Sequence, residues 1–108
     1  MAEEENEATK DKILASYYGD EDVTALITLK VDTQNVEKLA TEISKNKYVE
    51  DVFLVTGDID IIAKGHFNNY DECNDFVLNA IRQMEGVKDT KTLMVVTKFK
   101  ERGKIKED

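Results

Sequence analysis

An internal duplication narrows the possible folds of this chain more than any other feature of its sequence. A strand–helix–strand order runs from Ala25 to Thr56, and the same order recurs from Asp60 to Phe99. A doubled unit of this kind gives the order βαββαβ, which with right-handed crossovers folds as a ferredoxin-like split βαβ. We therefore expect an α+β domain with a four-stranded antiparallel sheet and both helices on one face.

Four segments have the pattern of strands. Apolar and polar residues alternate through Val23–Asp32, which is typical of a strand with one buried face, and Asp60–Phe67 is a further strand. Val52–Val55 is apolar at every position, and so is the 93–96 stretch of the last strand, 90–99. The helices cover only one face, so we expect the other to contact a second copy. The predicted dimer interface is Val52, Phe53, Leu54, Val55, Leu93 and Val95.

Two apolar stripes at helical spacing predict the helices. The first stripe is Val36, Leu39, Ala40 and Ile43. The second is Cys73, Phe76, Val77, Ala80, Ile81 and Met84. We expect Thr33 to cap the first helix, which should end near Asn46 or Lys47. Asn69 with Glu72 has the form of a capping-box variant at the start of the second helix, and Gly86 suits the left-handed residue that closes it.

Size and composition favour one small domain. The chain has 108 residues, one cysteine and 41% hydrophobic residues, and no apolar run approaches the roughly 20 residues that span a bilayer. The acidic N-terminus lacks the form of a signal peptide, so a cytoplasmic location is expected. One cysteine gives neither an internal disulfide nor a CxxC pair. Domains this small often need oligomerisation, which we also expect here.

Charge is distributed unevenly along the chain. Residues 1–22, the N-terminal arm, hold eight acidic and two basic side chains, and we expect them to be disordered or partly docked. Residues 23–99 form the domain, and 100–108 are a charged tail. Basic residues gather at 98–106, which predicts a solvated tail or, alternatively, contact with nucleic acid or an acidic partner. The acidic body offers no basic face, so direct nucleic-acid binding is not expected.

Two motifs carry a resemblance to a known family. Residues 52–62 read Val-Phe-Leu-Val-Thr-Gly-Asp-Ile-Asp-Ile-Ile, and residues 85–92 read Glu-Gly-Val-Lys-Asp-Thr-Lys-Thr. Both resemble the ligand-sensing RAM module of the Lrp/AsnC family, and the likeness spans about 23–99. It implies a ferredoxin-like fold, dimers formed through the sheets, rings of dimers, and amino acids bound in clefts between dimers. Full-length members add a helix-turn-helix domain that 22 residues cannot build, so we expect a stand-alone RAM protein.

The implied ligand site lies at the seam between the two repeats. The ammonium group of an amino acid could donate hydrogen bonds to the carboxylates of Asp58 and Asp60. Its carboxylate could accept hydrogen bonds from the backbone N–H groups of the Gly57 turn and from threonine hydroxyls. The resemblance gives the ligand-binding set Thr56, Gly57, Asp58, Asp60, Thr90 and Thr92. An ordinary hairpin turn is the alternative for the individual contacts. Asp58 and Asp60 could also attract a hard cation, but two carboxylates are too few for a protein site.

These features favour a non-enzymatic amino-acid sensor that oligomerises and modulates transcription through partners such as full-length Lrp/AsnC regulators. The alternative is a ligand-free dimerisation module that acts only on partner proteins. A small enzyme is a third class, but His66 is the only histidine and no spacing suggests a catalytic set. We assign neither His66 nor Cys73 a metal or catalytic role, and expect no cofactor and no membrane contact.

Overall fold

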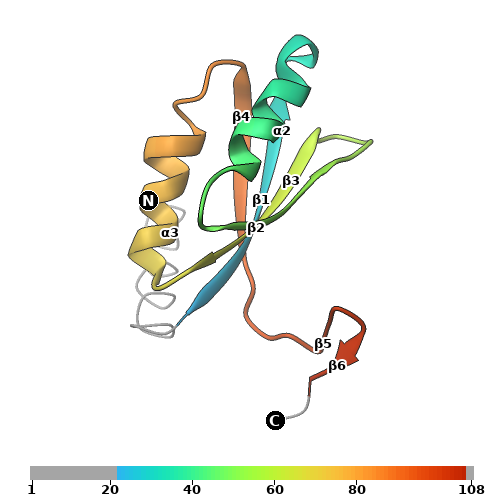
Figure 1. The fold of residues 1–108 in the computed structure, drawn as a ribbon, viewed down its shortest axis with the longest axis vertical. Helices are drawn as coiled ribbons and strands as arrows, with labels where there is room; N and C mark the ends of the chain where they lie inside the picture. The colour runs from blue at the N-terminus through green and yellow to red at the C-terminus, as the bar shows by residue number, and fades with distance from the viewer. Residues whose placement is uncertain (1–21, 107–108) are drawn as a thin grey trace, which may run out of the picture.

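The chain folds into a four-stranded antiparallel sheet with its helices on one face, as the duplication predicts (Figure 1). The computed structural model describes residues 22–106, so the prediction for the N-terminal arm lies outside the described residues apart from Asp22. The sheet order is β2-β3-β1-β4. In chain order the elements are β1 (Val23–Val31), the 3-10 turn η1 (Thr33–Asn35), α2 (Val36–Ser44), β2 (Val49–Leu54), β3 (Ile61–Phe67), α3 (Tyr70–Phe76), the π-helical turn η2 (Val77–Ile81), β4 (Val87–Met94), β5 (Lys100–Glu101) and β6 (Lys104–Ile105).

β1 is the central strand of the fold and shows the predicted alternation. It pairs with β3 on one side and β4 on the other. Ala25, Ile27 and Leu29 are fully buried against the helices, whereas Leu26 and Thr28 are only half-buried on the opposite face. The strand therefore divides the molecule into a helix-covered side, which holds the core, and an open sheet face.

Both predicted helical stripes face the core. Leu39 and Ile43 of the first stripe are buried, as are Cys73, Phe76, Val77 and Ile81 of the second. The remaining members of both stripes pack against the core at its margins. The second helix continues from α3 into η2, where the backbone N–H of Arg82 donates to the carbonyl of Val77.

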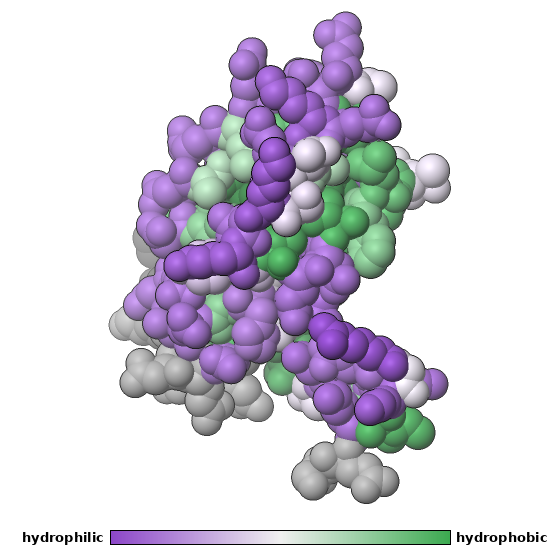
Figure 2. Space-filling view, in the orientation of Figure 1, coloured by the Kyte–Doolittle hydropathy of each residue, from purple (hydrophilic) through white to green (hydrophobic). Residues whose placement is uncertain are grey.

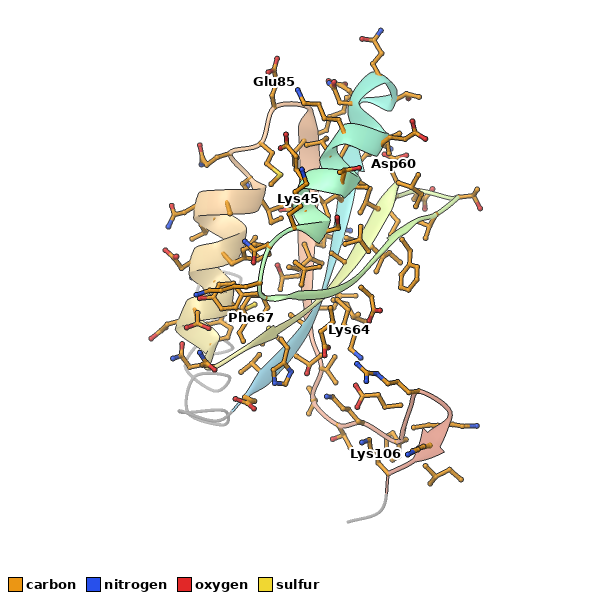
Figure 3. The ribbon with its side chains drawn as sticks, in the orientation of Figure 1. Lys45, Asp60, Lys64, Phe67, Glu85 and Lys106 are labelled. Atoms are coloured by element: carbon orange, nitrogen blue, oxygen red, sulfur yellow. The ribbon has the colours of Figure 1, made fainter. Side chains whose placement is uncertain are left out.

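An aromatic cluster closes one end of the core. The Phe67 ring lies 5.1 Å from Tyr48 and 5.6 Å from Phe76, measured between ring centroids, and Figure 3 shows Phe67 at the end of β3 beside α3. Phe67 also covers Gly65, where an added Cβ would lie 2.7 Å from the Phe67 Cε2 atom. Glycine at position 65 therefore leaves the space that this ring occupies.

The ends of the helices agree in part with the caps predicted from the sequence. Asn69 accepts a hydrogen bond from the Glu72 N–H at 2.8 Å, and Gly86 has φ of 97°, so the predicted cap and the left-handed closure are confirmed. The prediction that Thr33 caps the first helix was wrong. Thr33 lies inside η1, and the residue before α2 is Asn35, which makes no side-chain cap. The 3-10 turn instead satisfies the Asn35 N–H, which donates to the carbonyl of Asp32.

The C-terminal part of the chain differs most from the prediction. β4 begins at Val87 and ends at Met94, earlier at both ends than predicted. The segment predicted as a solvated tail instead forms the β5–β6 hairpin, which stands off from one end of the sheet (Figure 1). Arg102 and Gly103 both have positive φ, 52° and 80°, as a two-residue type I′ turn requires. We refer to residues 98–106 as the C-terminal hairpin.

Candidate functional site

The turn between β2 and β3 is preorganised and open to solvent. The Val55 N–H donates to the Asp60 carbonyl at 2.9 Å and so closes the turn. Gly57 has φ of 126°, a value that L side chains rarely adopt, and an added Cβ there would meet nothing within 4 Å. Thr56, Gly57 and Asp58 are all exposed. The turn therefore presents backbone donors and a carboxylate to whatever approaches this end of the sheet.

Asp60 connects the turn to the central strand. Its backbone N–H donates to the carbonyl of Leu29 at 2.9 Å, and its Oδ2 accepts from the Val31 N–H, also at 2.9 Å. Figure 3 shows Asp60 at the end of β3 nearest the turn. One carboxylate oxygen of Asp60 is therefore committed to the backbone of β1, which is a structural role that the sequence did not reveal.

Thr90 and Thr92 lie on β4, across the central strand from the turn. Thr90 pairs with Leu29 and Thr92 with Ile27, so both lie on the helix-covered side. Leu29 also pairs with Ile61, beside Asp60. Thr90 and the β3 end are thus separated by β1, about 10 Å at two strand spacings. The structure brings Thr90 and the turn to the same end of the sheet, whereas Thr92 lies one pleat further away.

Charged side chains surround this end of the sheet. Lys88 Nζ lies 3.2 Å from Asp32 Oδ1, and Lys30 faces Asp89 across the β1–β4 ladder. The sequence-based site did not include these four residues. The sequence signal that could have identified them is the presence of charged residues at the end of β1 and at the start of β4. Carboxylates and ammonium groups together can hold both charges of a zwitterion.

The open sheet face carries part of the predicted dimer interface. Phe53 is 57% exposed and Leu93 53% exposed, and the half-buried Leu26 and Ile62 lie between them on the central strands. Figure 2 shows hydrophobic side chains reaching the surface on the side where β2 lies. Four apolar residues on one sheet face form a patch that water solvates poorly.

The other predicted interface residues do not share this face. Val52 pairs with Ala63 and packs against the core, while Leu54 pairs with the buried Ile61 and is exposed at the edge of the helix-covered side. Val55 follows the end of β2, and Val95 follows β4 and is half-buried. A strand that is apolar at every position still alternates in space, which its composition alone conceals.

A second candidate site lies between the C-terminal hairpin and the open face. Lys64 Nζ donates to Glu101 Oε2 at 2.8 Å, and Figure 3 shows Lys64 directed from β3 toward the hairpin that carries Lys106. The Lys64 hydrogen bond, together with Lys98, lowers the pKa of Glu101 from 4.5 to about 2. The same bond raises the pKa of Lys64. This contact anchors the hairpin to the sheet.

Other groups with reactive or metal-binding chemistry are few in the described part of the chain. Cys73 is buried, and burial raises the pKa of its thiol to about 11, which disfavours the reactive thiolate. Residues 22–106 contain no group of three or more His, Cys, Asp or Glu side chains able to hold a metal ion. None of the helices in that range is long and apolar enough to cross a membrane.

Comparison with known proteins agrees with the resemblance seen in the sequence. Residues 24–105 match the Lrp/AsnC ligand binding domain family. An uncharacterized HTH-type transcriptional regulator of Pyrococcus horikoshii is 35% identical over 80 residues, which cover 74% of this chain and 53% of that protein. The HTH-type transcriptional regulator FL11 of Pyrococcus furiosus is 32% identical over 79 residues, covering 73% and 52%. The chain thus spans about half the length of these relatives.

Solved structures show the same fold. AsnC of E. coli superposes with a TM-score of 0.70 at 18% identity, over 81% of this chain and 58% of that one. A Neisseria meningitidis transcriptional regulator in complex with L-Met has a TM-score of 0.70 at 21% identity, over 87% and 60%. A Thermus thermophilus protein has a TM-score of 0.69 at 28% identity, over 73% of this chain and 99% of that one.

Proposed function

This chain belongs to the Lrp/AsnC ligand-binding domain family, and from that premise we propose that it is a non-enzymatic sensor of an amino-acid effector. Its relatives are transcriptional regulators, so the module serves regulation. The effector binds at the β2–β3 turn, in a cleft that a second pair of subunits completes. The sensor acts in the cytoplasm through partner proteins, full-length Lrp/AsnC regulators among them.

The observation that carries the proposal is the exposed turn that the hydrogen bond between Val55 and Asp60 closes. Gly57 keeps its backbone accessible because it lacks a Cβ, and Asp58 places a carboxylate beside it. An α-ammonium needs a carboxylate, and an α-carboxylate needs N–H or O–H donors. Asp58 supplies the acceptor, while the Gly57 N–H and the Thr56 hydroxyl supply donors. Thr90 lies at the same end of the sheet, on the opposite edge strand β4, and supports the site from there.

Asp60 has a positioning role in this proposal. One of its oxygens holds the Val31 N–H, so the turn keeps its position relative to β1. Asp58, whose side chain is exposed, is the primary acceptor for the ammonium.

Assembly is the second part of the proposal. The open face, with Phe53 and Leu93 more than half exposed, pairs with the same face of a second copy. A dimer of this kind leaves the β2–β3 turns at its periphery, where two dimers can meet. An amino acid enclosed between them would be shielded from water on both sides, which strengthens its charged hydrogen bonds.

The choice of an amino acid rests on two supports. The turn has the acceptors and donors that a zwitterion requires, and the neisserial neighbour of similar fold is a complex with L-Met. That neighbour is only 21% identical and so does not identify the effector of this chain.

Isothermal titration of the assembled protein with each of the twenty amino acids tests the proposal. We expect saturable binding of at least one, weakened tenfold or more, about 1.4 kcal/mol, by Asp58→Asn. Asp71→Asn, an exposed carboxylate in the first turn of α3, is the matched control and should bind as the wild type does. If the assembled wild type binds none of the twenty, the sensor proposal fails.

A ligand-free interaction module is the second candidate. It is favoured by the open sheet face, where Phe53 and Leu93 are more than half exposed, because that face offers a surface to a partner protein whether or not the turn binds a ligand. In that case a full-length Lrp/AsnC regulator would co-purify with the chain in the absence of any amino acid, and Asp58→Asn would leave the co-purified amount unchanged.

A further inference from the structure

The strand β4 lies at one edge of the sheet, and its outer side is open. It is the last strand of the sheet order and, within residues 22–106, it pairs only with β1 (Figure 1). Most of its side chains are exposed, namely those of Lys88, Asp89, Lys91, Thr92 and Leu93. An edge of this length carries unpaired backbone N–H and C=O groups that can bind another strand. The edge of β4 is therefore a candidate surface for a partner strand.

The ladder with β1 determines which backbone groups of β4 point outward. The Val95 N–H donates to the Thr24 carbonyl at 3.0 Å. Bonded residues alternate along an antiparallel ladder, so the odd-numbered residues of the 89–93 stretch also bond toward β1. Thr90 and Thr92 then direct their N–H and C=O groups away from the sheet, where a second strand can reach them.

The other edge strand, β2, is protected in ways that β4 is not. Its ladder with β3 is irregular between Val49 and Asp51, and its Glu50 lies 3.5 Å from Arg102 of the C-terminal hairpin. Bulges and covering loops are devices that keep an edge strand from pairing. The register shift of the β1–β4 ladder lies beside the first residues of β4, so the stretch 89–94 is regular. The regular edge is therefore that of β4.

We propose that the β4 edges of two copies of this chain pair in antiparallel orientation, with Thr90 opposite Thr90 of the second copy. A two-fold axis at Thr90 places Asp89 of each copy opposite Lys91 of the other. These two positions alternate with the hydrogen-bonded ones, so their side chains are the closest facing pairs of the new ladder. Opposite charges directly across an antiparallel pair stabilise it, whereas like charges destabilise it. The edge is thus complementary to itself.

Charge selects this register over its neighbours. A two-fold axis at residue 89 would place Asp89 opposite itself, and an axis at residue 91 would place Lys91 opposite itself. An axis at Thr92 would place both charges opposite apolar residues, Val95 and Leu93. Within residues 22–106 neither Asp89 nor Lys91 forms an ion pair, so both charges are left for a partner. The register centred on Thr90 satisfies both of them.

The edge contact is small and is separate from the sheet-face pairing proposed above. A pair of strand edges buries less than a standard interface of about 1,600 Å², so we expect weak association that is populated at high protein concentration. The sheet-face pairing uses apolar side chains such as Phe53, whereas the edge uses the outward backbone of β4. A chain with two distinct two-fold contacts can join dimers into larger assemblies. The β4 edge therefore supplies a further contact between dimers, and it does not depend on an effector.

Disulfide trapping between two variants tests the register. Asp89→Cys and Lys91→Cys are made in separate chains and mixed under mild oxidation at about 0.5 mM, since a contact this small binds weakly. Burial raises the thiol pKa of Cys73 to about 11, so the introduced cysteines are the reactive ones. Facing Cα atoms lie about 4.5 Å apart, within reach of a disulfide, whereas the diagonal 89–89 and 91–91 pairs lie about 7–8 Å apart, beyond it.

The cross-linked product identifies the pairing. We expect the mixture to give about ten times more cross-linked dimer than either variant alone, with one chain of each kind in the product. Mass spectrometry distinguishes the mixed dimer from dimers of a single variant. Equal yields from all three samples, or no cross-link in the mixture, would overturn the proposal.

The sheet face is excluded as the source of the cross-link by a second variant. Asp89 and Lys91 alternate with the helix-side Thr90, so they lie on the open face. Phe53→Asp is therefore added to both chains, which places a charge in the apolar patch and removes the face pairing. The cross-link should keep most of its yield. Its loss in this background would assign the contact to the sheet face and overturn the edge pairing.

Charge reversal gives an independent measurement. Asp89→Lys alone and Lys91→Asp alone each place like charges opposite one another, so the concentration-dependent shift of the Thr90 amide signal in nuclear magnetic resonance should disappear. Mixing the two variants restores opposite charges at both positions and should restore the shift. Lys38→Asp, at an exposed position on α2, is the matched control and should shift as the wild type does. A Thr90 signal that shifts equally in every variant, or in none of the proteins, would contradict the pairing.

Discussion

The Asp60 carboxylate accepts a hydrogen bond from the Val31 backbone N–H at 2.9 Å, joining the β2–β3 turn to the end of the central strand. The Val31 N–H lies where β1 leaves the sheet, after its ladder with β3 has ended at Leu29. The side chain of Asp60 thus replaces a backbone acceptor. Substitution of this residue affects the fold as well as any ligand.

Asp60→Ala is expected to lower the free energy of unfolding by about 1–3 kcal/mol, because the partly buried Val31 N–H loses its acceptor. Asp60→Asn keeps an oxygen at the same place and should retain most of the stability. Urea denaturation followed by circular dichroism measures both. An Ala variant as stable as the wild type would show that water replaces the carboxylate at no cost.

Replacing an apolar residue on the open face should break the proposed dimer. Phe53→Asp or Leu93→Asp places a charge in the patch and should shift the assembled protein to monomers in size-exclusion chromatography with light scattering. Leu78→Asp is the matched control, since Leu78 is a similarly exposed apolar residue on η2, away from the sheet. A monomeric wild type at micromolar concentration, or a control that dissociates equally, would contradict the proposed interface.

Acid should release the C-terminal hairpin before the domain unfolds. The folded pKa of Glu101 is lowered from 4.5 to about 2, so its contribution is fully present above pH 4.5 and is lost as the pH falls through about 2. The pKa of Lys64 is raised above 10.5, so its contribution persists through neutral pH and is lost only in strong alkali. Amide shifts of residues 100–105 should follow this acid transition, and Glu101→Gln should remove it. Shifts that follow global unfolding instead would contradict the assignment.

The core could be predicted because burial imposes a period on the sequence. The alternating apolar residues of β1 and the helical stripe through Leu39 and Ile43 mark the side chains that face the core. The structure buries these side chains as expected. The βαββαβ order of these elements is compatible with few sheet topologies when crossovers are right-handed. The ferredoxin-like sheet could therefore be predicted from the order of strands and helices.

The hairpin could not be predicted in the same way, because a tertiary contact stabilises it. Glu101 and Lys64 are far apart in sequence, and nothing local distinguishes a paired glutamate from a solvated one. The Arg102-Gly103 turn was the one local signal, and the charges around it masked it. Asp60 illustrates the same limit at the candidate site, since a carboxylate that binds a backbone N–H and one that binds a ligand have the same sequence signature.

Gly65 provides a final test of how closely the aromatic cluster is packed. Gly65→Ala should cost about 1–3 kcal/mol of unfolding free energy, because the new Cβ would overlap the Phe67 ring at 2.7 Å. Phe67→Leu removes the edge of that ring and costs stability by itself. In the double variant the two losses should sum to less than their separate values, since the clash no longer exists. Thermal denaturation of the four proteins measures this coupling. Strictly additive losses would mean that the ring moves aside freely and that Gly65 is retained for another reason.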